Sequence, residues 1–117
     1  MHYVISTTWG PTDTTRASLP FIFSATALSA GDSVMIMLFH DSVSIGVQGA
    51  YEGMQPVGPA PKFAEVFANP QAEIVVCEPC AKARGITESM LAEGLRFGGM
   101  GDFYRHVSRE DSKVVTF

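Results

Sequence analysis

The sequence is poor in the features that mark several large protein classes. It has only two cysteines, one tryptophan and 17% charged residues among its 117 positions. Its net charge is −4 and it has no basic cluster, so we do not expect it to bind nucleic acid. No apolar run approaches the roughly 20 residues of a membrane-spanning helix, so no membrane association is expected. Repeats, low-complexity tracts and linkers are also missing, which indicates a single domain over residues 1–117.

Two further absences bear on the compartment. Residues 1–5 lead directly into a strand-like pattern, with no charged segment ahead of an apolar stretch, so we expect no signal peptide. Two cysteines are too few for the disulfide framework of a small secreted domain. We therefore expect a cytoplasmic protein, in which a close cysteine pair is more often reactive or metal-binding than a structural cross-link.

Apolar residues, by contrast, are abundant. The hydrophobic fraction is 46%, and the mean hydropathy of +0.16 is high for a small soluble monomer. A chain of this length buries one core. The remaining apolar surface predicts a homo-oligomer.

Strand-like and helix-like segments alternate along the chain. Segments rich in β-branched and aromatic residues predict strands at 3–9, 34–39, 73–76, 95–97 and 113–117. Apolar spacing and capping residues predict helices at 14–29, 41–46, 62–68, 79–84, 87–94 and 102–109. This alternation predicts an α/β fold, a three-layer α/β/α sandwich around a mainly parallel sheet of about five strands.

Two segments carry more specific expectations. Pro20 lies inside the first predicted helix and lacks an N–H, so we expect a kink or a later start there. Residues 46–61 are rich in glycine and proline and predict a long mobile loop. Sites in parallel sheets lie beyond the carboxyl ends of the strands. We expect the loops after Trp9, after Phe39 and at Cys77 to converge there.

The most informative residues are Cys77 and Cys80, in the run Cys-Glu-Pro-Cys between a predicted strand and a predicted helix. The positive end of a helix dipole favours a thiolate, so we expect a lowered pKa at Cys77. Four uses stay open: two buried small hydrophobes, half of a metal site, a redox dithiol, or a carrier of sulfur. A zinc site needs about four ligands, and the three histidines show no ligand spacing, so we expect neither a metal nor a cofactor.

Several other residues are candidates for supporting roles. His40 and Asp41 end a central strand and could orient a group or move a proton near the cysteines. Arg16, with Thr14 and Thr15, begins a predicted helix and could bind an anion, although ordinary capping explains these residues equally well. The cations Lys82 and Arg84 are expected either to add positive potential at the thiols or to be solvated.

Cys-Glu-Pro-Cys resembles the Cys-Gly-Pro-Cys of thioredoxins, but it follows the third predicted strand, whereas the thioredoxin motif follows an early one. A second resemblance covers most of the chain. Residues 74–86, Ile-Val-Val-Cys-Glu-Pro-Cys-Ala-Lys-Ala-Arg-Gly-Ile, resemble the active-cysteine segment of the DsrE-like family, which includes DsrE, DsrF, TusD and YchN-type proteins. Residues 7–21 and the closing residues 111–117 resemble the peroxiredoxin-annotated branch of that family.

This resemblance implies a cytoplasmic sulfur-relay protein that assembles into trimers or hexamers. It places the persulfide on Cys77, with other sulfur carriers or small donors such as thiosulfate or polysulfide as partners. Many members have only that cysteine. The second thiol, Cys80, could resolve a persulfide into a disulfide. The alternative function is a thiol–disulfide or peroxide-handling protein that uses the same pair as a dithiol.

Overall fold

All five strands belong to one parallel sheet in the computed structural model, which describes residues 1–117. The strands are β1 (His2–Thr7), β2 (Ser33–Leu38), β3 (Ala72–Cys77), β4 (Arg96–Gly98) and β5 (Ser112–Thr116). Their order across the sheet is β4-β3-β2-β1-β5, and every neighbouring pair is parallel. The predicted parallel sheet of about five strands is therefore confirmed.

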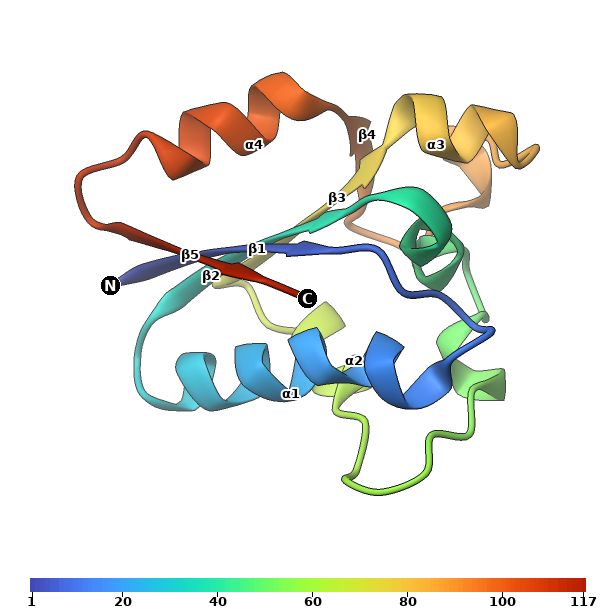
Figure 1. The fold of residues 1–117 in the computed structure, drawn as a ribbon, viewed down its shortest axis with the longest axis horizontal. Helices are drawn as coiled ribbons and strands as arrows, with labels where there is room; N and C mark the ends of the chain where they lie inside the picture. The colour runs from blue at the N-terminus through green and yellow to red at the C-terminus, as the bar shows by residue number, and fades with distance from the viewer.

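Helices cover both faces of this sheet (Figure 1). The helices are α1 (Thr14–Ser29), α2 (Phe63–Phe67), α3 (Glu78–Ala83) and α4 (Met100–Val107), with shorter 3₁₀ helices η1 (His40–Gly46), η2 (Tyr51–Gly53) and η3 (Glu88–Met90). Helices α1 and α2 lie on one face, and α3 and α4 lie on the other. This arrangement is the predicted three-layer sandwich. None of the helices is both long and apolar enough to span a membrane.

The core is centred on β2, the middle strand of the sheet. Residues 34–38 of this strand are at most 1% exposed, because helices cover them on both sides. A strand buried on both faces needs apolar side chains at every position, which explains the continuous run Val-Met-Ile-Met-Leu. On the α1 face, the Phe21 ring packs against the rings of Phe63 and Phe67, which joins α1 to α2.

Helix α1 is continuous across its proline. It begins at Thr14 and is capped by Asp13, whose carboxylate accepts a hydrogen bond from the Arg16 amide. Pro20 is buried within the second turn. Of the two expectations at Pro20, the later start is wrong, and the kink stays a prediction. Packing of this face against the sheet keeps the helix continuous despite the missing N–H.

The glycine- and proline-rich segment 46–61 is held at several points. Its first residues pair with the end of η3 and the segment after it, through Gln48 N–H to Met90 O at 2.9 Å and Ala92 N–H to Gly46 O at 2.8 Å. Its end is tied to α1, because the Thr15 hydroxyl both donates to Val57 O and accepts from Val57 N–H. The segment also contains η2, so it is not one loop without regular structure.

The boundaries of two later helices differ from those predicted. Only one 3₁₀ turn, η3, forms within 87–94, because the chain then turns back to pair with the segment after η1. Helix α4 begins at Met100, two residues before the predicted cap. Asp102 lies inside its first turn and reaches back to accept from the Gly99 amide at 3.0 Å.

A histidine pair ties α4 to the start of the sheet. His2 is 4% exposed, and its Nε2 lies 2.9 Å from Nδ1 of His106. The second ring nitrogen of His106 lies 3.2 Å from the Glu73 carboxylate, and the second nitrogen of His2 lies 2.7 Å from the Ser33 hydroxyl. Sequence reasoning gave His106 no special role, and this contact across 104 residues has no local sequence signal.

This pair predicts a loss of stability in mild acid. Burial, followed by the positive charge of Arg109, lowers the pKa of His2 from its usual 6.5. Between pH 7.5 and 5.5 the unfolded chain therefore binds a proton that the folded chain resists, so the free energy of unfolding falls as pH falls. Urea unfolding across this range should show that slope in the wild type and a shallower one in His2→Gln. An equal slope in His2→Gln would contradict the assignment.

Candidate functional site

The register of the sheet brings three strand ends together. Thr7 of β1 pairs with Leu38 of β2, and Leu38 pairs with Val76 of β3. The next residue of β3 is Cys77, so it leaves the sheet level with the loops after β1 and β2. These are the three loops that the sequence predicted to converge.

Cys77 and Cys80 form an adjacent pair of free thiols at this edge. Cys77 is the last residue of β3, and Cys80 lies one turn into α3, after Pro79 in the first turn of the helix. Proline is tolerated there because its missing N–H would have no partner in the helix. The turn points both side chains the same way. The Sγ atoms are 2.8 Å apart, and the Cys77 thiol donates a hydrogen bond to the Cys80 sulfur.

The two thiols differ in exposure and in electrostatic setting. Cys77 is 7% exposed, whereas Cys80 is partly exposed. Burial raises the pKa of the Cys77 thiol, and its hydrogen bond to the Cys80 side chain adds to this increase. The Cys80 backbone N–H and, to a smaller extent, the positive charge of Arg84 act in the opposite direction. The expected lowering of the Cys77 pKa is therefore wrong, because the cost of burying a charged sulfur exceeds the stabilisation from its surroundings.

An arginine joins the cysteine helix to the loop after β2. The Arg84 guanidinium donates to the same Asp41 carboxylate oxygen through Nε at 3.0 Å and Nη2 at 2.8 Å. Its third nitrogen, Nη1, donates to the carbonyl of Cys80 at 3.0 Å. This pairing lowers the pKa of Asp41. The predicted supporting residue Asp41 therefore meets the cysteine segment through Arg84.

A close backbone contact fixes the position of Asp41. A Cβ on Gly10 would lie 2.3 Å from the Asp41 carbonyl oxygen, so only glycine fits between the loops after β1 and β2. Below this contact the Ser42 hydroxyl donates to the carbonyls of both Thr7 and Phe39. The ends of β1 and β2 are thus joined directly beneath the site.

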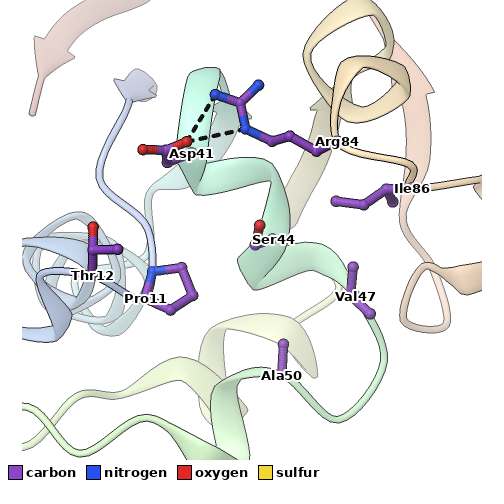
Figure 2. A pocket seen from close by; sticks show the side chains of 8 residues that line it. All are labelled: Pro11, Thr12, Asp41, Ser44, Val47, Ala50, Arg84 and Ile86. Atoms are coloured by element: carbon purple, nitrogen blue, oxygen red, sulfur yellow. Dashed lines mark hydrogen bonds and ion pairs between the residues drawn. The ribbon is translucent and has the colours of Figure 1, made fainter.

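A cavity of about 580 Å³ opens beside the Asp41–Arg84 pair (Figure 2). Its lining residues come from the loop after β1, from η1 and the segment that follows it, and from the end of the cysteine segment: Pro11, Thr12, Asp41, Ser44, Val47, Ala50, Arg84 and Ile86. Its wall is mostly apolar, with one ion pair and two hydroxyls. The cysteine sulfurs are not part of that wall, so Arg84 is the link between the cavity and the thiols.

The remaining candidates lie further from the thiols. His40 is exposed, 3.5 Å from the Asp41 carboxylate, with a left-handed backbone (φ 55°) that is unusual for a residue other than glycine. Arg16 lies over the Trp9 ring, 4.4 Å from its centre, and also faces Asp13 at 3.7 Å. The Thr14 and Thr15 hydroxyls bind the backbone of the segment before α2. These contacts favour capping and loop attachment over an anion site at this helix start.

Sequence reasoning found the thiols and Asp41 but missed Gly10 and the bridging role of Arg84. The Gly-Pro pair after the first strand signalled only a turn. Across all 117 residues the structure brings together no group of three or more His, Cys, Asp or Glu side chains that could hold a metal ion.

Together, the fold and the site define a parallel α/β protein with a dithiol at the carboxyl edge of its sheet. The chain belongs to the DsrE/DsrF-like family, whose family model matches residues 1–117. This family is generally related to sulfur relay. The resemblance drawn from the cysteine segment is therefore confirmed over the whole chain.

Two curated relatives and two solved structures are similar to the chain. An uncharacterised protein of Methanocaldococcus jannaschii is 34% identical over 120 residues, covering 100% of both chains. An uncharacterised protein of Methanopyrus kandleri is 32% identical over 102 residues, covering 85% of this chain and 80% of its own. The E. coli YchN structure shares the fold with a TM-score of 0.72 at 19% identity, over 100% and 99% of the two chains. The structure of a Methanobacterium thermoautotrophicum protein of unknown function has a TM-score of 0.73 at 16% sequence identity, and the match covers 99% of this chain and 98% of that one.

The close contact at Gly10 predicts that a larger residue at this position lowers the stability of the protein. Gly10→Ala places a methyl group against backbone atoms that cannot turn aside, so it should lower the free energy of unfolding by about 1–3 kcal/mol. Urea unfolding measures this loss. The control is Gly53→Ala, where no atom lies within 4 Å of the added Cβ and the change should be much smaller. Equal effects at the two positions would contradict the close approach.

Proposed function

We propose that this chain is a sulfur carrier that accepts sulfane sulfur as a cysteine persulfide and passes it to an acceptor thiol. The observation that carries the proposal is the adjacent pair of free thiols, one buried and one partly exposed, at the carboxyl edge of the sheet in a member of a family related to sulfur relay. Sulfane sulfur is the zero-valent outer sulfur of a persulfide, polysulfide or thiosulfate.

The chemistry needs a thiolate and no cofactor. A cysteine thiolate attacks the outer sulfur of the donor, a new S–S bond forms, and the donor leaves as a thiolate, a shorter polysulfide or, from thiosulfate, sulfite. The cysteine then carries a persulfide. In the return step an acceptor thiolate attacks the outer sulfur, and the cysteine thiolate is the leaving group. One sulfur atom moves in each step, and neither step requires an external oxidant or reductant.

The difference in exposure supports different roles for the two cysteines. Cys80 is the more accessible sulfur and accepts the hydrogen bond of Cys77, so it makes the first attack. The outer sulfur then passes to Cys77, whose Sγ is 2.8 Å from that of Cys80. Only the outer sulfur changes partners in this step. Cys77, which is 7% exposed, stores the persulfide away from stray thiols, in keeping with the role that the family resemblance gives it.

The same contact supports a second candidate function, a thiol–disulfide or peroxide-handling protein. A disulfide has sulfurs about 2.0 Å apart, so little movement would join these two. If Cys80 attacked the inner sulfur of a Cys77 persulfide, sulfide would leave and a Cys77–Cys80 disulfide would form. Loading and this step together oxidise two thiols to a disulfide and reduce the sulfane sulfur to sulfide, and a dithiol reductant would have to restore the pair.

The proposal also includes a cytoplasmic location and assembly with other copies or with other sulfur carriers. A reducing compartment keeps both thiols free. Apolar side chains support assembly: Met100 and Tyr104, one turn apart on α4, are 64% and 70% exposed, and Val114 on the edge strand β5 is 49% exposed. An exposed edge strand beside an apolar helix face is a common site of pairing with a second chain.

Sulfur loading tests the function directly. The protein is incubated with polysulfide or thiosulfate, and its intact mass is measured over time. The wild type should gain and keep one sulfur atom per chain. Cys80→Ser should gain it more slowly but keep it, and Cys77→Ser should gain it quickly and lose it. The double Ser variant is the control and should gain none.

The other outcomes are equally informative. No sulfur gain, together with the loss of two hydrogens under a mild oxidant, would replace the carrier function by the dithiol one. No adduct and no oxidation would overturn both. Sulfur retained by the double Ser variant would mean that the two cysteines are not the site.

Assembly is tested by light scattering at micromolar concentration, where we expect a trimer or hexamer. Met100→Ser with Tyr104→Ser should reduce the mass, because both changes remove exposed apolar area without touching the core. Glu110→Gln, which changes an exposed residue outside α4 without altering its size, serves as the control. A wild-type monomer would contradict the prediction.

A further inference from the structure

The Arg84 side chain forms hydrogen bonds both to the cysteine helix and to the loop after β2. Three of its N–H groups are used, two on one Asp41 oxygen and one on the Cys80 carbonyl. Its side chain is 29% exposed, less than that of Asp41 at 46%. The guanidinium thus holds the last turn of α3 against η1, and its charge has a fixed place relative to the thiols.

The charges that face Cys77 identify the groups that matter. Besides Cys80, the charged group that acts on it is Arg84, which favours the thiolate. Lys82 on the same helix is paired with Glu78 at 2.7 Å and is 67% exposed, so solvent screens it. Asp41 lies against Arg84 with the opposite charge, and His40 lies beyond Asp41.

The position of Asp41 is built into the fold. The backbone contact at Gly10 and the left-handed conformation of His40 set where the carboxylate emerges. A residue other than glycine in that conformation costs free energy, and such strain persists where the surrounding structure imposes it. The fold itself therefore places the carboxylate beside Arg84.

We propose that Arg84 is a positioning residue that promotes formation of the reactive thiolate, and that Asp41 attenuates it by holding and partly neutralising the guanidinium. The two partners of one ion pair then have opposite effects on the Cys77 sulfur. Arg84 favours the Cys77 thiolate, and Asp41 keeps its reactivity low until something in the adjoining cavity competes for the carboxylate or for the guanidinium. This inference concerns the dithiol of the proposed function, but it holds for any reaction of these thiols.

The test is the pH profile of alkylation by iodoacetamide, which reacts with thiolates and needs no sulfur donor. Arg84→Gln should move the profile to higher pH and slow alkylation at pH 7. Asp41→Asn should move it to lower pH and speed alkylation. A displacement of half a pH unit corresponds to about a threefold change in rate on the rising limb, which sets the expected size. Arg84→Lys should recover part of the rate, because it restores the charge without the paired donors.

Lys82→Gln is the matched control, because it removes an equal charge from the same helix and should leave the profile within error. Urea unfolding of each variant checks that the fold is intact. A structural role alone would move Arg84→Gln and Asp41→Asn in the same direction, since both break one contact, and that result would overturn the proposal. Unchanged profiles in both would also overturn it. If the alkylation profiles of Arg84→Gln and Asp41→Asn shift in opposite directions but the wild type gains no sulfur, this inference is supported and only the proposed function is overturned.

Discussion

The site depends on one constraint, that three neighbouring parallel strands end at the same level of the sheet. Because β1, β2 and β3 pair in parallel with Thr7, Leu38 and Val76 in line, their loops leave the sheet side by side. A shift of one residue in β3 would reverse which face each of its side chains occupies and would turn Cys77 away from its present surroundings. The buried run of β2 limits such shifts, because sliding this strand along its neighbours would bring the polar residues at the ends of the run into the core.

The site itself is a balance between burial and charge. Removing a sulfur from water raises the pKa of the Cys77 thiol, whereas the Arg84 charge lowers it. An uncompensated thiolate would react with any electrophile, and a fully buried thiol would react with none. The structure lies between these limits, with one thiol sheltered and the other partly exposed. This arrangement suits a group that must accept a sulfur atom, hold it and release it.

Much of the fold could be read from the sequence, because local patterns encode it. The continuous apolar run of β2 and the Cys-Glu-Pro-Cys turn each carry a signal within a few residues. The contacts that complete the site do not. Asp41 and Arg84 are 43 residues apart, and nothing near either residue specifies the other. The direction of the Cys77 pKa was missed for a similar reason, since it depends on how deeply the helix and sheet bury the sulfur.

The proposed sulfur transfer requires the two thiols to act in sequence, with Cys80 receiving the sulfur and Cys77 storing it. Rapid quenching of the wild-type protein after exposure to polysulfide, followed by peptide mapping, measures which cysteine carries the added sulfur at each time. We expect the sulfur first on Cys80 and then increasingly on Cys77. Sulfur on Cys77 from the earliest time, with none on Cys80, would contradict it.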